Sequence, residues 1–284
     1  MSLVINNNLM ANSAARHLTD AYSKLSSSTE KLSSGLRINS SADDAAGMAV
    51  SELMKSDVAT LNQGVRNAND GISMIQTADG ALSVIDEKLI RMKELAEQAS
   101  TGTYTSTQRL IIDSEYQAMA SEITRIANAT DFNGIYLLNG NLSGDGLTVH
   151  FGTGNDSSED KYSVVIGNST AGALGVGHAA TGAGASVSTQ ALAQAALDAL
   201  DKAVVSKDNI RANLGALENR LNATISNLEV QSENLSAAQS QIADVDVATE
   251  MTNYTKQQII TQSAVAMLSQ ANSLPQMALS LIQG

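Results

Sequence analysis

The stretch that decides the fold runs from residue 214 to residue 242 and reads LGALENRLNATISNLEVQSENLSAAQSQI. A leucine or isoleucine recurs at every seventh position of this stretch. A seven-residue apolar repeat returns to the same face of a helix every two turns, as in coiled coils and helical bundles. The stretch therefore predicts a long helix that packs along a partner helix. The repeating positions are Leu214, Leu221, Leu228, Leu235 and Ile242.

Apolar residues also recur at alternating spacings of three and four on both sides of this stretch. Such runs are typical of helices that bury one face. A helix of about 50 residues is about 75 Å long and cannot bury its stripe against itself, so we expect the two flanks of the chain to pack together. The runs cover residues 18–36, 54–99, about 108–129, 192–242 (with Lys207 at one repeating position) and 260–281, and Ser106 and Thr107 are candidate N-caps.

The middle of the chain differs, because twelve of the twenty glycines lie between Gly134 and Gly184. Residues 147–151 and 162–166 are strand candidates on either side of the loop sequence GTGNDSSED, which predicts a β-hairpin. Residues 167–188 are rich in Gly, Ala and Ser and are expected to be irregular. The predicted fold is mainly α, a long antiparallel helical bundle or coiled coil formed by the N- and C-terminal flanks, with a small β-hairpin in the middle.

The composition excludes several classes of protein. The 284 residues include no cysteine, no tryptophan and one proline, and the aromatic fraction is 3%. Without cysteine there are no disulfides and no thiolate metal sites. The net charge of −12 opposes nucleic-acid binding. No apolar run approaches the roughly 20 residues that cross a bilayer, and the N-terminus lacks the pattern of a cleaved secretory signal. We expect neither a nucleic-acid nor a membrane partner.

One fragment resembles a cofactor fingerprint by its spacing alone. Gly175, Gly177 and Ala180 in GVGHAA match the pattern G-x-G-x-x-A, but no clear βαβ unit surrounds them. The three histidines of the chain lie in separate segments, so they do not predict metal ligation. The fragment is therefore interpreted as part of a glycine-rich loop, and no cofactor is expected.

Two groups of carboxylates have structural interpretations. Asp244 and Asp246 would point to different sides of a helix, so these residues and Glu250 are interpreted as a solvated face rather than a cation site. Asp43 and Asp44 precede a periodic run and suit the first turn of a helix, where a carboxylate favours the helix dipole. No constellation predicts catalysis, and the chain is expected not to be an enzyme.

The two ends of the chain carry few bulky apolar side chains. Residues 1–40 and 250–284 are rich in Ser, Asn, Gln and Ala. Ordering a residue costs roughly 1 to 2 kcal/mol of backbone entropy, which such side chains scarcely offset. We expect both ends to be mobile in the monomer and to fold when copies of the chain assemble.

Several long motifs, in order along the chain, resemble those of bacterial flagellin. They include KLSSGLRINSSADDAAGMAVSELM at 31–54, NQGVRNANDGISMIQTADGALSVIDEKLIRMKELAEQAS at 62–100 and TDFNGIYLLNG at 130–140. The resemblance continues from GALENRL at 215–221 nearly to the C-terminus. It implies a minimal flagellin without large outer domains, a structural subunit that polymerises into the flagellar filament for swimming motility.

The resemblance also implies three regions of chain. Residues 1–43 and 245–284 would be the terminal helices of the inner tube, and residues 44–139 with 190–244 the helical domain of the outer tube. Residues 140–189 would be a short variable hairpin and loop region. The candidate assembly seams are Leu18, Leu25, Leu32, Leu36, Ile260, Met267, Leu274 and Leu281.

The partners implied by the resemblance begin with copies of the chain in an open helical polymer. An export chaperone is expected at the C-terminal helix near Ile259–Leu281. Filament cap and junction proteins are further expected partners. The family is exported to the extracellular flagellum through a type III apparatus without a cleaved signal peptide. The variable region is expected to be exposed, so it offers possible O-glycan sites at Ser157, Ser158, Ser169 and Thr170.

The segment LIRMKELAEQ is similar to the flagellin epitope that Toll-like receptor 5 recognises. Arg91, Glu94 and Leu95 match this epitope, and Glu115 lies at the matching place on the next helix. Ile90 replaces the usual glutamine of the family. The alternative interpretation is that Arg91 and Glu94 make ordinary contacts between subunits.

Three other classes of protein are alternatives. A hook-filament junction protein has similar ends, but its match would weaken between residues 60 and 140, where this chain keeps the resemblance. A chemoreceptor signalling hairpin also has long heptads rich in Ala, Ser and Gln, but it would need a membrane segment and a polar tip. An enzyme within a filament subunit would need an inserted domain that bears catalytic residues.

Overall fold

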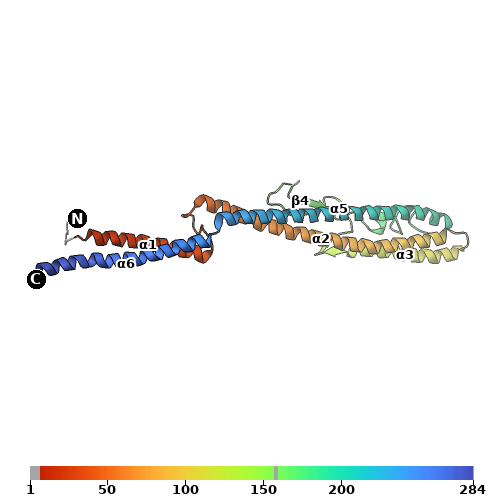
Figure 1. Cartoon of the computed structure of the whole chain (residues 1–284). Coiled ribbons are helices and arrows are strands. Elements are labelled where there is room, and N and C mark those ends of the chain that lie inside the picture. Colours follow the sequence, from red (N-terminus) through yellow and green to blue (C-terminus); the bar gives the residue numbers. More distant parts are fainter. Residues whose placement is uncertain (1–6, 157–158, 284) are drawn as a thin grey trace. The chain divides into compact units, whose positions relative to one another are not determined.

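The computed structural model of the chain describes residues 7–156 and 159–283, but not the side chains of residues 274–276 and 278–283. Its helices and strands confirm the mainly α prediction (Figure 1). Two compact units share the long helices: the terminal unit, up to Ser56 and from Asn234 onward, and the central unit, Asp57–Glu233. The elements are α1 (Leu9–Ser34), α2 (Ala45–Ser100), α3 (Ser106–Ala129), β1 (Asp131–Phe132), β2 (Ile135–Tyr136), β3 (Leu147–His150), β4 (Lys161–Val164), α4 (Ala171–Leu174), α5 (Gln190–Ala243) and α6 (Val247–Gln283).

The core of the central unit lies between α2, α3 and α5. Leu214, Leu221 and Leu228 of the heptad stretch are buried on α5. Many of the other buried positions on the three helices are alanines, which let helices approach closely. The buried residues of α2 recur at spacings of three and four, as predicted, and include Leu82, Ile85, Leu89, Met92, Ala96 and Ala99.

Polar side chains fix the antiparallel register of α2 and α5. Along the pair the residue numbers rise on α2 as they fall on α5, which is what an antiparallel arrangement requires. Arg211 binds Asp79 with two hydrogen bonds of 2.7 and 3.1 Å. The other pairs are Gln76 with Glu218 (2.8 Å), Asp86 with Lys207 (2.5 Å) and Lys93 with Asp201 (2.5 Å).

The predicted β-hairpin is confirmed, with β3 and β4 paired antiparallel from Leu147↔Val164 to His150↔Lys161. It packs against α2 at a glycine, because a Cβ built on Gly64 would lie within 2.0 Å of the Phe151 carbonyl oxygen. The Asn67 amide adds a hydrogen bond of 2.8 Å to the His150 carbonyl. A second pair of short strands, β1 and β2, was not predicted.

Residues 167–188 are irregular, as predicted, apart from the single turn α4. Side chains of α3 hold this segment: the Tyr116 hydroxyl donates to the Gly184 carbonyl at 2.8 Å, and the Val187 N–H donates to Asp113 at 2.7 Å. Gly175 and Gly177 have positive φ angles of 77° and 72°. Gly175 caps α4 and Gly177 packs against α3, so these glycines serve the local fold, which agrees with the loop interpretation.

Short polar side chains begin the helices, with two differences from the predictions. The capping box of α3 uses Thr105 and Gln108, so the N-cap precedes the predicted Ser106 and Thr107. Asp44 lies before α2 rather than in its first turn, and its carboxylate accepts the Gly47 N–H at 2.9 Å. Such a carboxylate satisfies a backbone donor that has no partner inside the helix.

In the terminal unit, backbone hydrogen bonds join the end of α1 to the break between α5 and α6. Gly35 ends α1 in the left-handed conformation, and its carbonyl accepts the Val245 N–H at 3.0 Å. The Arg37 N–H donates to the Ala243 carbonyl at 2.6 Å. Asp246 then caps α6, because its carboxylate accepts the N–H groups of Ala248 and Thr249. Asp246 therefore caps α6 and stays exposed to solvent, as the interpretation of a solvated face expects.

None of the helices in the described part of the chain combines the length and the hydropathy that a bilayer crossing needs. Among residues 7–156 and 159–283, no three His, Asp or Glu side chains gather as a metal site requires.

Candidate assembly and recognition surfaces

A seam of small and medium side chains joins α1 to α6 within the terminal unit (Figure 1). Only Ala21, Ser28, Thr261 and Ala271 are buried on these two helices among the described side chains. The buried and half-buried positions alternate at spacings of three and four, as in a coiled-coil seam. On α1 they include Ala11, Ala14, Leu18, Ala21, Leu25, Ser28 and Leu32, and on α6 Glu250, Tyr254, Gln257, Thr261, Ala264, Leu268 and Ala271.

Some of the candidate assembly residues lie in this seam and others do not. On α1, Leu18, Leu25 and Leu32 belong to it, whereas Leu36 lies beyond the helix end. On α6, the seam uses the positions that follow Ile260 and Met267, and these two side chains are 40% and 64% exposed. Ile260 and Met267 therefore do not belong to the seam within one chain. That they contact another copy of the chain stays a prediction. The side chains of Leu274 and Leu281 lie outside the described residues.

The seam has this position because the α6 sequence carries two apolar stripes. One stripe is weakly apolar and includes Thr261 and Ala264, and it faces α1. The other includes Ile260 and Met267, which stay exposed at the edge of the seam. Pattern reasoning favours the more hydrophobic stripe as the internal one. In this helix the small residues pack inside because they let the two helices come close.

An apolar groove of about 460 Å³ lies between α1 and α6. Met10, Ala14 and His17 line it from α1, and Ile260 and Met267 from α6. Exposed apolar surface is typical of interaction sites, so this groove is a candidate assembly surface.

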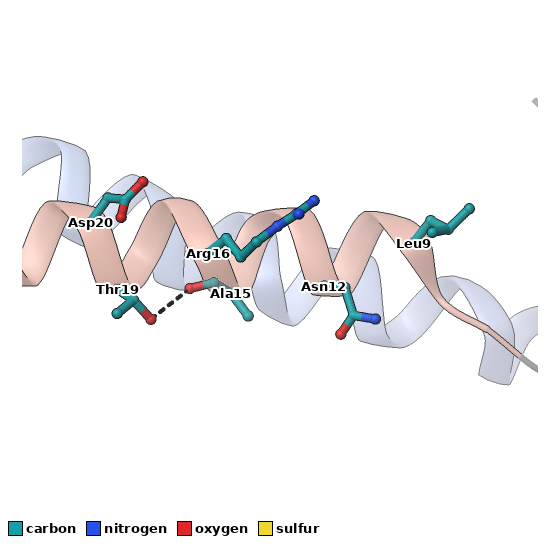
Figure 2. Close-up of a pocket in the computed structure, with 6 residues that line it drawn as sticks. All are labelled: Leu9, Asn12, Ala15, Arg16, Thr19 and Asp20. Carbon is teal, nitrogen blue, oxygen red and sulfur yellow. Dashed lines mark hydrogen bonds between the residues drawn. The ribbon is translucent and has the colours of Figure 1, made fainter.

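A second, more polar hollow runs along α1 (Figure 2). Figure 2 shows Leu9, Arg16 and Asp20 along one edge of it, and Asn12 and Thr19 along the other. Leu9 is 74% exposed at the start of the helix. The terminal unit thus presents two hollows that no described part of the chain fills.

The candidate receptor residues form a charged cluster that bridges α2 and α3. The Arg91 guanidinium donates to Glu94 at 2.8 Å and to Glu115 at 2.8 and 3.0 Å. Hydrogen bonds to Glu94 and then Glu115 raise the pKa of Arg91. All three side chains are exposed. Leu95 instead lies in the core, so it can only position the other three.

The candidate O-glycan sites divide into described and undescribed residues. Ser169 is fully buried, which corrects the expectation that its hydroxyl is exposed. Thr170 is half-buried, and its hydroxyl accepts the Ala173 N–H as the N-cap of α4. The Ser169 N–H ties the loop to the preceding segment, because it donates to the Leu138 carbonyl at 2.9 Å. Ser157 and Ser158 lie outside the described residues.

A buried lysine in the core of the central unit was not predicted as a structural site. The Lys207 ammonium lies 2.5 Å from Asp86 and 2.7 Å from Asp208, and its side chain is almost fully buried. The sequence feature that could have predicted this burial is the position of Lys207 in the apolar repeat of residues 192–242. A charged residue at such a position is stable only when it is paired.

The chain matches the bacterial flagellin N-terminal helical region over residues 5–143 and the C-terminal helical region over residues 197–282. It is 40% identical over 289 residues to flagellin FlaB2 of Treponema pallidum, with 99% of this chain and 100% of the relative covered. It is 41% identical over 281 residues to a flagellin of Halalkalibacterium halodurans, with the same shares covered.

A solved structure from Vibrio parahaemolyticus, described as a flagellar hook-associated protein, shares the fold. It superposes with a TM-score of 0.57 at 16% identity, covering 71% of this chain and 100% of that one. At this identity the likeness concerns the fold alone.

Proposed function

The chain belongs to the bacterial flagellin family, and from this premise we propose that it polymerises with copies of itself into the filament of the bacterial flagellum. Its role is structural, and the filament that it builds serves swimming motility. The observation that carries the proposal is the contrast in the terminal unit between a thin internal seam and a large uncovered apolar surface.

The terminal helices leave several of their bulky hydrophobic residues exposed. The seam between α1 and α6 buries small side chains, while Ile259, Ile260 and Met267 stay exposed. Such a surface is stabilised when a neighbouring copy covers it. Contacts between two different patches of successive copies do not close into a ring unless the rotation allows it, and otherwise they build an open helical filament.

The three regions follow from the same premise. Residues 1–43 with 245–284 form the inner tube, residues 44–139 with 190–244 the outer tube, and residues 140–189 the variable region. The breaks at Gly35–Asp44 and Asp244–Asp246, where helices end and begin, support the boundary between the first two. The compact units divide at other points, after Ser56 inside α2 and after Glu233 inside α5, because these helices continue through both units.

In this proposal, binding by a chaperone and export from the cell precede assembly. The chain leaves the cell through the flagellar type III apparatus without a cleaved signal, and a chaperone covers α6 near Ile259–Leu281 until then. The exposed side chains of Ile259 and Met267 support this, because they would promote premature association in the cell. Filament cap and junction proteins are further partners in this proposal.

Recognition by Toll-like receptor 5 is a separate proposal for the surface of α2 and α3. Arg91, Glu94 and Glu115 make the contact, and Leu95 supports α2 from the core. The Arg91→Ala and Glu115→Ala monomers are expected to lose most of the response in a receptor reporter assay. An unchanged response by both variants would contradict the assignment.

Electron microscopy of the purified full chain tests the filament proposal. After seeding with filament fragments, or after salting out, we expect long filaments of uniform width. Persistent monomers under every condition would overturn the proposal. The hook-filament junction alternative predicts short assemblies that fail to elongate, so the filament length separates the two functions.

A further inference from the structure

Among the described residues, the exposed methionines all lie on α1 and α6. In the central unit, Met74 and Met92 are buried and Met119 is half-buried. On the terminal helices, Met10 is 49% and Met267 is 64% exposed. Methionine sulfur reacts with oxidants that reach it, so the reactive thioethers gather on the helices that we propose to assemble.

Met10 and Met267 lie on opposite walls of the groove between α1 and α6. The Asn8 amide donates to the Ala271 carbonyl at 2.8 Å, which fixes the register of the two helices at this end. Met10 follows Asn8 by two residues, and Met267 precedes Ala271 by four. Both thioethers therefore belong to one end of the same apolar surface.

We propose that Met10 and Met267 form an oxidation-sensitive pair, and that their oxidation stops the chain from adding to a filament. The occupant of the groove is a second copy of the chain, so this inference rests on the proposed function. The oxidant accepts two electrons and transfers one oxygen atom, as hydrogen peroxide and hypochlorous acid do.

With hydrogen peroxide, the thioether sulfur attacks one peroxide oxygen. The O–O bond breaks and an S–O bond forms, so sulfur loses two electrons and the peroxide is reduced to water. The product is methionine sulfoxide, a polar and chiral group in place of a flexible apolar one. Burying its oxygen against an apolar surface without a hydrogen bond opposes assembly.

The geometry also makes the effect depend on the state of the chain. Before assembly the two methionines are 49% and 64% exposed, whereas a neighbouring copy in the groove would shield them. The reaction therefore acts on free subunits and spares the filament. Because Met74 and Met92 are buried, the same dose leaves the central unit folded.

The test measures seeded elongation of the full chain after treatment with hydrogen peroxide and removal of the oxidant. Peptide mass mapping identifies the oxidised methionines, and sedimentation gives the concentration of chain left unassembled at equilibrium. We expect that concentration to rise about tenfold or more, the effect of leaving one buried polar oxygen unpaired. Treatment with both methionine sulfoxide reductases and a thiol reductant should restore elongation.

Two variants locate the effect. The double variant Met10→Leu with Met267→Leu should elongate equally before and after oxidation. Met251→Leu replaces an equally exposed methionine of α6 outside the groove, and it should lose elongation as the unaltered chain does.

Two results would overturn the inference: normal elongation of chains that carry sulfoxide at both positions, or a double variant that is inhibited as strongly as the unaltered chain. If the double variant fails to elongate even untreated, reductase repair of the unaltered chain decides. Failure of the untreated, unaltered chain to elongate would contradict the filament proposal instead.

Discussion

Lys207 stabilises the central unit in two ways, through the packing of its aliphatic stem and through the pairing of its charge. Its ammonium is buried between Asp86 and Asp208. Lys207→Ala removes the aliphatic stem and leaves both carboxylates unpaired, so we expect the free energy of unfolding in urea to fall by about 2–4 kcal/mol. Lys207→Met keeps the volume and removes only the charge, and it should cost clearly less. An equal loss in both variants would mean that charge pairing, not packing volume, sets the cost.

Asp246 links the start of α6 to pH. Hydrogen bonds from the Thr249 hydroxyl, and then from the Thr249 and Ala248 N–H groups, lower its pKa below 3.8. A lowered folded-state pKa means that the cap stabilises the helix fully above the ordinary pKa, and that this contribution is lost as the pH falls through the folded value. The amide resonances of Ala248 and Thr249 should therefore shift at acid pH. The Asp246→Asn side chain still caps the helix but does not titrate, so in this variant the amide resonances of Ala248 and Thr249 should not change with pH. A shift of these resonances in the variant would exclude Asp246 as the cause.

Among the elements, the contact between α2 and the hairpin depends on Gly64. A Cβ there would meet the Phe151 carbonyl at 2.0 Å, whereas a Cβ on Gly80 of the same helix meets nothing within 4 Å. Gly64→Ala should lower the free energy of unfolding by about 1–3 kcal/mol through backbone displacement. Gly80→Ala should raise it by about 0.5–1 kcal/mol through helix propensity. Thermal unfolding measures both, and stabilisation by Gly64→Ala would show that the hairpin moves freely.

Helices were predictable at this scale because the repeat of Leu214, Leu221 and Leu228 has one consistent interpretation. The face of α6 that packs against α1 was not predictable. Two apolar stripes on this helix compete for the contact, and the packing of small residues decides between them. The charged cluster was placed by resemblance, but its contacts needed the fold: Arg91 reaches Glu115 only because α3 turns back beside α2. The burial of Ser169 also depends on how the irregular loop folds onto α3, which local composition does not encode.

For the whole molecule, the two units should differ in local stability. The central unit buries a continuous apolar core, whereas the terminal unit buries mainly Ala21, Ser28, Thr261 and Ala271 on its two helices. The free energy of local opening follows buried apolar contacts. Amides of α1 and α6 in the monomer should therefore exchange with deuterium many times faster than those of residues 72–99. In the filament the terminal amides should become protected, because neighbouring copies cover Ile260 and Met267. Strong protection of both terminal helices in the monomer would show that the internal seam is sufficient by itself, and that folding of the ends is not coupled to assembly.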